Sequence, residues 1–143
     1  MKILIINGPN LNLLGKRETG HYGVLTIDDI EKIIKTEYSN DYFEFFQSNI
    51  EGEIVGKLHG ADSYFDGVII NPGGYAHTSV AIRDALEIVK IPKIEVHLSN
   101  LSSRDDFRQT LITAPVCNGY LSGFKENSYL AAIYILKRNY IKK

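Results

Sequence analysis

The residues best suited to moving protons stand at the end of one apolar run. His97 closes the segment Lys93–His97, and Glu95 lies two positions before it. Residues two apart in a β-strand point to the same face, so the carboxylate can orient the imidazole. A histidine held in this way is a general acid or base near neutral pH. We favour this interpretation over a structural histidine buried in the core.

A second candidate pair lies in a glycine-rich segment near the N-terminus. Arg17 and Tyr22 stand between Gly15 and Gly23, a composition that suits a mobile lid. Tyrosine is a poor base at neutral pH unless a nearby cation favours its phenolate form, and arginine carries a permanent charge. Taken alone, such a pair is more often a surface cation–π contact. Opposite His97 in a cleft, Tyr22 becomes a candidate general base.

The pattern of the whole chain predicts how these segments are positioned. Short apolar runs alternate with helical patterns, and the expected strands are Lys2–Asn7, Tyr42–Gln47, Gly67–Asn71, Lys93–His97 and Gly119–Ser122. The expected helices are Thr26–Tyr38, Ile50–Ala61, Ser79–Val89, a short turn over Ser102–Phe107, and Tyr129–Leu136. This alternation predicts an α/β fold: a flavodoxin-like, doubly wound five-stranded parallel sheet in the order 2-1-3-4-5.

Length and composition favour one catalytic domain over residues 1–143. Hydrophobic residues make up 44% of the chain, which suffices for a single core. The net charge of -1 gives no reason to expect a nucleic acid or a membrane as partner. Cys117 is the only cysteine, which excludes a disulfide within the chain, and the first apolar run is too short for a signal peptide. We therefore expect a cytoplasmic protein.

Polar residues gather where the predicted strands end. In a doubly wound sheet the ligand binds at the carboxyl ends of the strands, at the switch point between strands 1 and 3. Asn7 and Asn12 are interpreted as turn or capping residues, a common use of asparagine. For Asn10 and Asn71, each next to a proline, a turn role and a ligand role are equally open. His77 follows the Gly-Gly turn, where it can donate to an anionic ligand.

No marker for a metal or an organic cofactor occurs in the sequence. His77, His97 and Glu95 lack a recognised ligand spacing such as HExxH. The first strand is not followed by GxGxxG, which argues against a dinucleotide. No lysine stands at a predicted strand end inside the cleft, which argues against a Schiff base. We expect acid–base chemistry with no metal and no cofactor.

Four stretches together resemble one family. They are NGPNLNLLGKRE with Tyr22-Gly23, then IINPGGYAHTSVAIRDAL, then IEVHLSN with Arg104 and Phe107-Arg108, and finally Gly119–Phe124. In this combination they resemble the type II 3-dehydroquinate dehydratases, in register over nearly the whole chain. The resemblance implies elimination of water from 3-dehydroquinate to give 3-dehydroshikimate through an enolate, a step of the shikimate pathway. It also implies a homododecamer built from trimers.

The same resemblance implies a role for each candidate residue. Tyr22 would be the base, held as phenolate by Arg17, and Asn10 would hold a water that stabilises the enolate. His97, oriented by Glu95, would protonate the departing hydroxyl. The expected substrate contacts are Asn71, His77, Arg108 toward a hydroxyl, the Leu98-Ser99 backbone toward the carboxylate, and Asp84 reaching the site of a neighbouring subunit.

The chain departs from the family pattern at three places. Thr19-Gly20 stands where many members have a proline after the glutamate, which is expected to loosen the lid. Gly74 and Ala76 replace an expected alanine and threonine. Loss of the threonine hydroxyl is expected to alter affinity more than reaction type.

Three other functions remain as alternatives. A flavodoxin-like domain can hold a mononucleotide at the same edge, and a flavin binder would copurify yellow. A signalling receiver needs an acidic cluster after strand 1, where this chain has Asn7-Gly8-Pro9-Asn10. A relative that has lost catalysis is disfavoured by the presence of Arg17, Tyr22 and His97. A biosynthetic role and a quinate-catabolic role stay equally open, because the reaction is the same.

Overall fold

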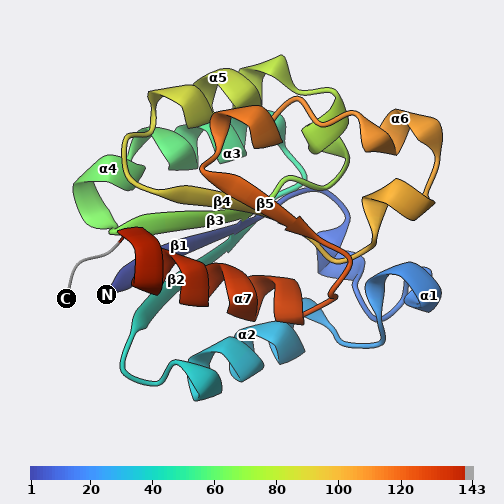
Figure 1. The fold of residues 1–143 in the computed structure, drawn as a ribbon, viewed down its shortest axis with the longest axis horizontal. Coiled ribbons are helices and arrows are strands. Elements are labelled where there is room, and N and C mark those ends of the chain that lie inside the picture. Colours follow the sequence, from blue (N-terminus) through green and yellow to red (C-terminus); the bar gives the residue numbers. More distant parts are fainter. Residues whose placement is uncertain (141–143) are drawn as a thin grey trace.

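Helices cover both faces of a five-stranded parallel sheet in the computed structural model, which describes residues 1–140 (Figure 1). The strands are β1 (Lys2–Asn7), β2 (Tyr42–Gln47), β3 (Gly67–Asn71), β4 (Lys93–His97) and β5 (Gly119–Ser122). All neighbouring pairs are parallel and the order is β2-β1-β3-β4-β5. The predicted flavodoxin-like fold, strand order and strand bounds are confirmed. The end of the expected domain range, residues 141–143, lies outside the described chain.

β1 and β3 are apolar along nearly their whole length because both of their faces are covered, whereas β4 alternates apolar residues with the buried Lys93, Glu95 and His97. Every residue of β3 and of β4 is buried, and so are all residues of β1 after Lys2. Successive residues of β1 point to opposite faces of the sheet. Ile3 and Ile5 join one hydrophobic core, and Leu4 and Ile6 join the other.

Each core is closed by a pair of helices. On one face lie α2 (Ile27–Glu37) and α7 (Asn127–Ile135), and on the other lie α3 (Glu51–His59) and α5 (Val80–Ile88), as Figure 1 shows. Their buried side chains follow the helical spacing of the sequence: Ile30 and Ile34 in α2, Ile54 and Leu58 in α3, Ile82 and Leu86 in α5, Tyr129 and Ile133 in α7. The two layers hold the carboxyl ends of β1, β3 and β4 at one edge.

The start of α2 has the capping box expected from its sequence. Thr26 Oγ1 accepts from the Asp29 N–H at 3.1 Å, and Asp29 Oδ2 accepts from the Thr26 N–H at 3.0 Å. These bonds satisfy two backbone donors that the first helical turn leaves without partners. The cap fixes where the preceding glycine-rich segment enters the helix.

Several connecting segments differ from the expected bounds. The expected loop over residues 8–25 contains a 3₁₀ turn at Leu11–Leu13 and the short helix α1 (Thr19–Tyr22). The helix expected over Ile50–Ala61 ends at His59 and is followed by α4 (Ala61–Tyr64). Further 3₁₀ turns span Gly73–His77 and Ala114–Val116, and α7 continues as a π-helical turn over Leu136–Tyr140.

The turn expected over Ser102–Phe107 is wrong in its bounds. Two separate elements occur there, a 3₁₀ turn at Leu101–Ser103 and α6 (Asp106–Gln109). The first begins where Asn100 accepts from the Ser102 N–H through its side chain. The second cannot continue it, because Arg104 has extended backbone angles.

Over residues 1–140, no helix combines the length and the apolar character that crossing a membrane requires.

Candidate active site

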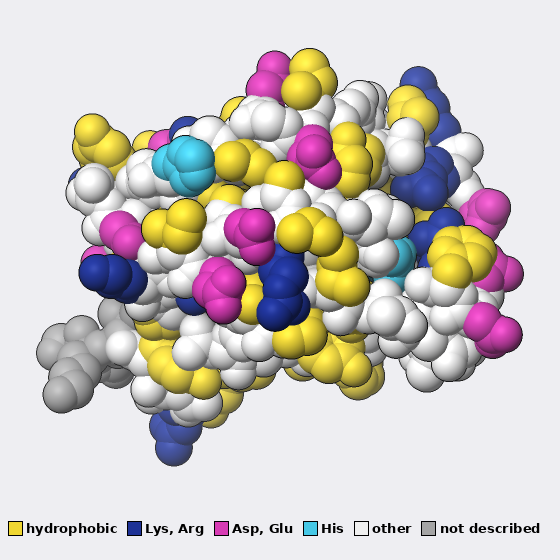
Figure 2. Space-filling model, turned by 90° about the horizontal axis from the view of Figure 1, so that it is seen from above, with side chains coloured by type: hydrophobic (Ala, Val, Ile, Leu, Met, Phe, Trp, Pro, Cys, Tyr) yellow, Lys and Arg dark blue, Asp and Glu magenta, His cyan; other side chains and the backbone are white. Residues whose placement is uncertain are grey.

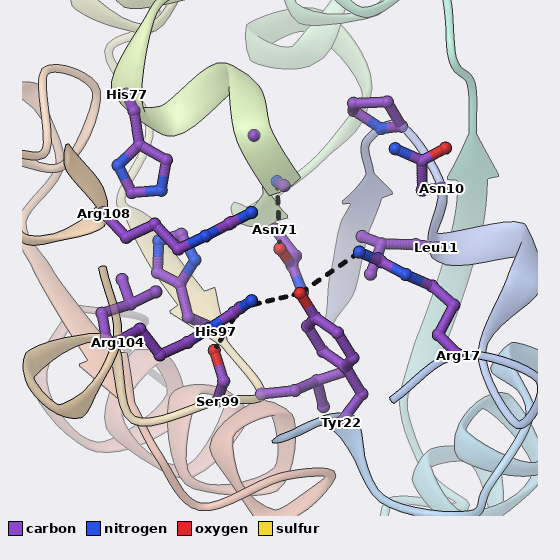
Figure 3. Close-up of a pocket in the computed structure, with 15 residues that line it drawn as sticks. Asn10, Leu11, Arg17, Tyr22, Asn71, His77, His97, Ser99, Arg104 and Arg108 are labelled. Atoms are coloured by element: carbon purple, nitrogen blue, oxygen red, sulfur yellow. Dashed lines mark hydrogen bonds between the residues drawn. The ribbon is translucent and has the colours of Figure 1, made fainter. Parts of the chain in front are cut away.

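A pocket of roughly 520 Å³, counted with its open mouth, lies at the carboxyl ends of β1, β3 and β4 (Figure 3). This is the switch point at which ligands bind in doubly wound sheets. The predicted site residues that line it are Asn10, Arg17, Tyr22, Asn71, His77, His97, Leu98, Ser99 and Arg108. Residues scattered over most of the chain are thus brought to one cavity.

The Tyr22 hydroxyl lies between two guanidinium groups. It accepts from Arg17 Nη2 at 3.2 Å and from Arg104 Nη1 at 2.7 Å, as Figure 3 shows. The guanidinium carbons lie 4.2 Å and 5.1 Å from the centroid of the tyrosine ring. Two hydrogen-bond donors and two positive charges therefore face this one oxygen. Helix α1 makes the arrangement possible, because its single turn folds Tyr22 back toward Arg17.

Arg104 is a site residue that sequence reasoning missed as a functional group, although its motif was recognised. It follows the 3₁₀ turn after β4, and its Nη1 also donates to Ser99 Oγ at 3.3 Å. Its side chain is only 8% exposed, so little water screens its charge from the hydroxyl of Tyr22. The available signal was its position, since a cation just past a strand at the ligand edge points into the cleft.

His97 is oriented by a fully buried carboxylate, as its spacing predicted. His97 Nε2 lies 3.1 Å from Glu95 Oε2, and the other carboxylate oxygen, Oε1, accepts from the hydroxyl of Thr113. Both oxygens of Glu95 are therefore engaged, which fixes the plane of the carboxylate and with it the imidazole. Thr113 gave no usable signal, because it is distant in sequence and lies outside every recognised motif.

His77 stacks on His97 and faces the pocket with one specific nitrogen. The ring centroids are 6.4 Å apart, and His77 Nδ1 lies 2.9 Å from the carbonyl oxygen of Thr110. A carbonyl only accepts, so Nδ1 carries the proton and Nε2 of the neutral ring is an acceptor. Burial lowers the pKa of His77, and the charges of His97 and Arg108 lower it further against the opposing bond to Thr110. This geometry fits a ligand hydroxyl rather than the anion expected from the sequence.

Asn10 reaches the pocket through a left-handed backbone conformation, and Asn71 reaches it from the end of β3. Asn10 has φ 68°, a left-handed conformation that asparagine tolerates, and its N–H donates to Asn49 Oδ1 at 2.9 Å. Asn71 is buried, and its backbone oxygen accepts from the Gly8 N–H at 2.7 Å. A Cβ at position 8 would lie 2.4 Å from the oxygen of Pro72, so this approach requires glycine.

Arg108 brings an unused donor to the site. Its Nε is buried and has no hydrogen-bond partner within residues 1–140. The nearest carboxylate oxygen, from Asp105, is 3.7 Å away, an ion pair too long for a hydrogen bond. A buried donor without a partner is rare and points to a ligand that supplies the acceptor.

The pocket is strongly basic. Its lining includes Arg17, Arg104 and Arg108, and no aspartate or glutamate of the described chain joins them. Figure 2 shows lysine or arginine side chains beside a histidine at the end of the molecule where α6 lies in Figure 1. Such a cavity favours an anionic ligand such as a carboxylate.

Some predicted residues lie elsewhere. Glu95 lies behind His97 and does not line the pocket, and Asp84 is exposed on α5 away from it. Asn7 is buried and accepts a hydrogen bond from Tyr129, whereas Asn12 is exposed. Ala76 is fully buried and outside the pocket lining. The threonine hydroxyl that the family pattern places at position 76 would therefore lie outside the pocket lining.

Groups that could supply other chemistry are not assembled at this site. Within residues 1–140, no three His, Cys, Asp or Glu side chains lie close enough together to hold a metal ion. Burial raises the pKa of the Cys117 thiol to about 12, with the charge of Glu95 adding to the effect. A thiol in this state is protonated at neutral pH and is not a nucleophile.

The fold and the pocket define a flavodoxin-like α/β protein with a pocket at the switch point of its sheet, lined by Tyr22, His97 and three arginines. The profile of the family described as Dehydroquinase class II matches residues 1–137, and the chain belongs to this family. The resemblance found in the sequence is confirmed, and the chain is a hydro-lyase by family.

Individual relatives match over nearly their full lengths. The 3-dehydroquinate dehydratase of Fusobacterium nucleatum is 50% identical over 147 residues, covering 99% of this chain and 100% of that protein. The one from Thermotoga neapolitana is 49% identical over 140 residues, covering 96% and 95%. The crystal structure of type II dehydroquinase from Butyrivibrio crossotus superposes with a TM-score of 0.93 at 47% identity, covering 96% of this chain and 97% of that one.

Proposed function

We propose that the protein eliminates water from 3-dehydroquinate to give 3-dehydroshikimate, with Tyr22 as base and His97 as acid and without metal or organic cofactor. The observation that carries the proposal is the Tyr22 hydroxyl, held between Arg17 and Arg104 in the same pocket as His97. A phenol between two cations is a base, and a carboxylate-oriented imidazole is an acid. Elimination needs this combination.

In the first step the phenolate oxygen of Tyr22 takes a proton from the carbon next to the ketone. The electrons of the broken C–H bond form a carbon–carbon double bond, and the negative charge moves to the ketone oxygen of the substrate. The substrate becomes an enolate, and Tyr22 becomes neutral. Asn10 holds a water that donates to the enolate oxygen. The left-handed backbone of Asn10 supports this role, because it turns the residue toward the pocket.

In the second step the enolate collapses and the C–O bond of the ring hydroxyl breaks. His97 gives its proton to the departing oxygen, so that water leaves and a conjugated double bond forms. Glu95 holds the imidazole in position for the transfer, since its carboxylate lies against Nε2. The proton taken up by Tyr22 returns to His97 through solvent, which completes the cycle.

The remaining polar groups would bind the substrate. Arg108 donates from its unpartnered Nε to a ring hydroxyl, and His77 accepts from another through Nε2. The backbone of Leu98-Ser99 binds the carboxylate. Asp84 can contribute only to the pocket of a neighbouring copy, and we propose a cytoplasmic homododecamer built from trimers, each chain forming one catalytic domain.

An absorbance assay tests the proposed reaction. Purified protein is mixed with 3-dehydroquinate without added metal, and ultraviolet absorbance is followed. The product is conjugated and the substrate is not, so absorbance is expected to rise and to persist in the presence of a chelator. A flat trace from folded protein would contradict the proposed function.

Replacing Arg104 by methionine is expected to lower kcat/KM by about tenfold to a hundredfold, the usual worth of one hydrogen bond to a charged group. The substitution removes the shorter of the two bonds to the Tyr22 hydroxyl together with one positive charge. Steady-state kinetics measure the loss. The matched variant Arg104→Lys keeps the charge and is expected to retain more activity. Equal activity of Arg104→Met and wild type would remove Arg104 from the mechanism.

A further inference from the structure

A buried tyrosine behind the pocket is not used by the proposed mechanism. Tyr129 projects from α7, is 2% exposed, and its hydroxyl contacts two asparagines. Its oxygen lies 2.6 Å from Asn7 Oδ1 and 3.1 Å from Asn71 Nδ2. Asn7 ends β1 and Asn71 ends β3, and the two are partners in the sheet register. One hydroxyl thus links both strand ends at the switch point.

The direction of each hydrogen bond follows from a single backbone donor. The Gly73 N–H can only donate, and it lies 3.1 Å from Asn71 Oδ1, so the amide oxygen faces Gly73. The amide nitrogen of Asn71 therefore faces Tyr129 and donates to its oxygen. The hydroxyl proton of Tyr129 is left for Asn7 Oδ1. Burial raises the pKa of Tyr129, so this proton stays in place at neutral pH.

These hydrogen bonds use only one of the two amide hydrogens of Asn71. The nitrogen carries two hydrogens, and the bond to Tyr129 uses one of them. Asn71 lines the pocket (Figure 3), so the second hydrogen is available to a bound ligand. The amide cannot reverse without breaking its bonds to both Gly73 and Tyr129. The hydrogen bonds to Gly73 and Tyr129 therefore determine that Asn71 presents an N–H to the ligand.

We propose that Tyr129 is a positioning residue for substrate binding, which holds the Asn71 amide so that its free N–H donates to an oxygen of the bound anion. This inference rests on the proposed function and takes Asn71 as a substrate contact, as the family resemblance implies. Because this donor is fixed before the substrate arrives, little conformational entropy is lost in ordering it on binding. It contacts an oxygen both before and after proton transfer, so its loss raises KM and leaves kcat nearly unchanged.

The variant Tyr129→Phe removes one oxygen and keeps the ring that fills the core. Its KM for 3-dehydroquinate is expected to rise about tenfold, the size of one hydrogen bond, with kcat little altered. The matched control is Tyr38→Phe. The Tyr38 hydroxyl also bonds to α7, at Leu130 O with a distance of 2.9 Å, but Tyr38 does not line the pocket. Tyr38→Phe is expected to lower Tm without changing KM.

A double-mutant cycle separates positioning from general destabilisation. If Tyr129 acts through Asn71, the substitution Tyr129→Phe adds nothing to KM once Asn71→Ala is present. Independent, additive increases in KM would overturn the inference, and so would an unchanged KM in Tyr129→Phe alone.

A measurement without substrate tests the role of Tyr129 independently of the proposed function. Exchange of the Asn71 side-chain amide protons with solvent, followed by nuclear magnetic resonance and assigned with Asn71→Ala, is expected to be slow in wild type. It is expected to be faster in Tyr129→Phe, whatever the protein's substrate is. Should Tyr129→Phe not fold, Asn7→Ala removes the acceptor of the hydroxyl proton and is expected to speed the same exchange. Unchanged exchange in the folded variants would refute positioning by Tyr129.

Discussion

Replacing Tyr22 by phenylalanine is expected to lower kcat by about a thousandfold, within the range usual for a general base. The hydroxyl oxygen is the only heavy atom removed, and both Arg17 and Arg104 donate hydrogen bonds to it. The substrate keeps its other contacts, so KM changes much less than kcat. Steady-state absorbance kinetics measure both constants, and thermal unfolding shows that the variant is folded.

Two controls make the Tyr22 result specific. Tyr64 is 73% exposed on α4, so Tyr64→Phe removes an equivalent hydroxyl far from the pocket and is expected to retain full activity. In deuterated water, wild type is expected to exchange the hydrogen next to the ketone, and Tyr22→Phe is expected to lose this exchange together with elimination. Continued exchange in Tyr22→Phe would assign the base to another residue.

Replacing His97 by asparagine is expected to lower kcat by about a hundredfold to a thousandfold, through the loss of the general acid. Proton abstraction precedes departure of the hydroxyl, so the variant is expected to keep exchanging the hydrogen next to the ketone. Mass spectrometry of recovered 3-dehydroquinate would show deuterium above the level reached in buffer alone. The two variants thereby separate the two half-reactions.

The His97 experiment needs a check on folding, because Glu95 loses its imidazole partner in a fully buried position. A buried charge without a partner destabilises a protein, and Tm is expected to fall even though Thr113 still donates to Glu95. His59 is exposed at the end of α3, and His59→Asn is expected to leave turnover and Tm unchanged. A His97→Asn variant that loses both elimination and exchange while folded would refute separate roles for His97 and Tyr22.

The fold was predictable because each of its signals is local. β1 and β3 are almost continuously apolar, a pattern typical of parallel strands that are covered on both faces. The helices of the cores carry apolar residues at helical spacing, and Thr26 with Asp29 marks the start of α2. Bounds were less predictable where capping decides them, as between Leu101–Ser103 and α6.

The contact between His97 and Glu95 was equally local, since the two-residue spacing of a strand places both side chains on one face. The pairing of Arg17 with Tyr22 was predictable for a similar reason, because a single segment holds both. Strand order then placed the two pairs at one edge of the sheet. Sequence by itself therefore determined the fold, the switch-point location and the pairing of the proposed acid–base groups.

Tertiary structure alone decided which further residues contact the proposed acid–base groups and the asparagines beside them. Arg104 reaches the Tyr22 hydroxyl, Thr113 reaches Glu95, and Tyr129 joins Asn7 to Asn71, all across long sequence separations. No periodicity records such contacts, because each depends on how separate elements pack and on a side chain turning to satisfy a buried polar atom. The proton on His77 Nδ1 is a similar case, since the Thr110 carbonyl that fixes it comes from a distant loop.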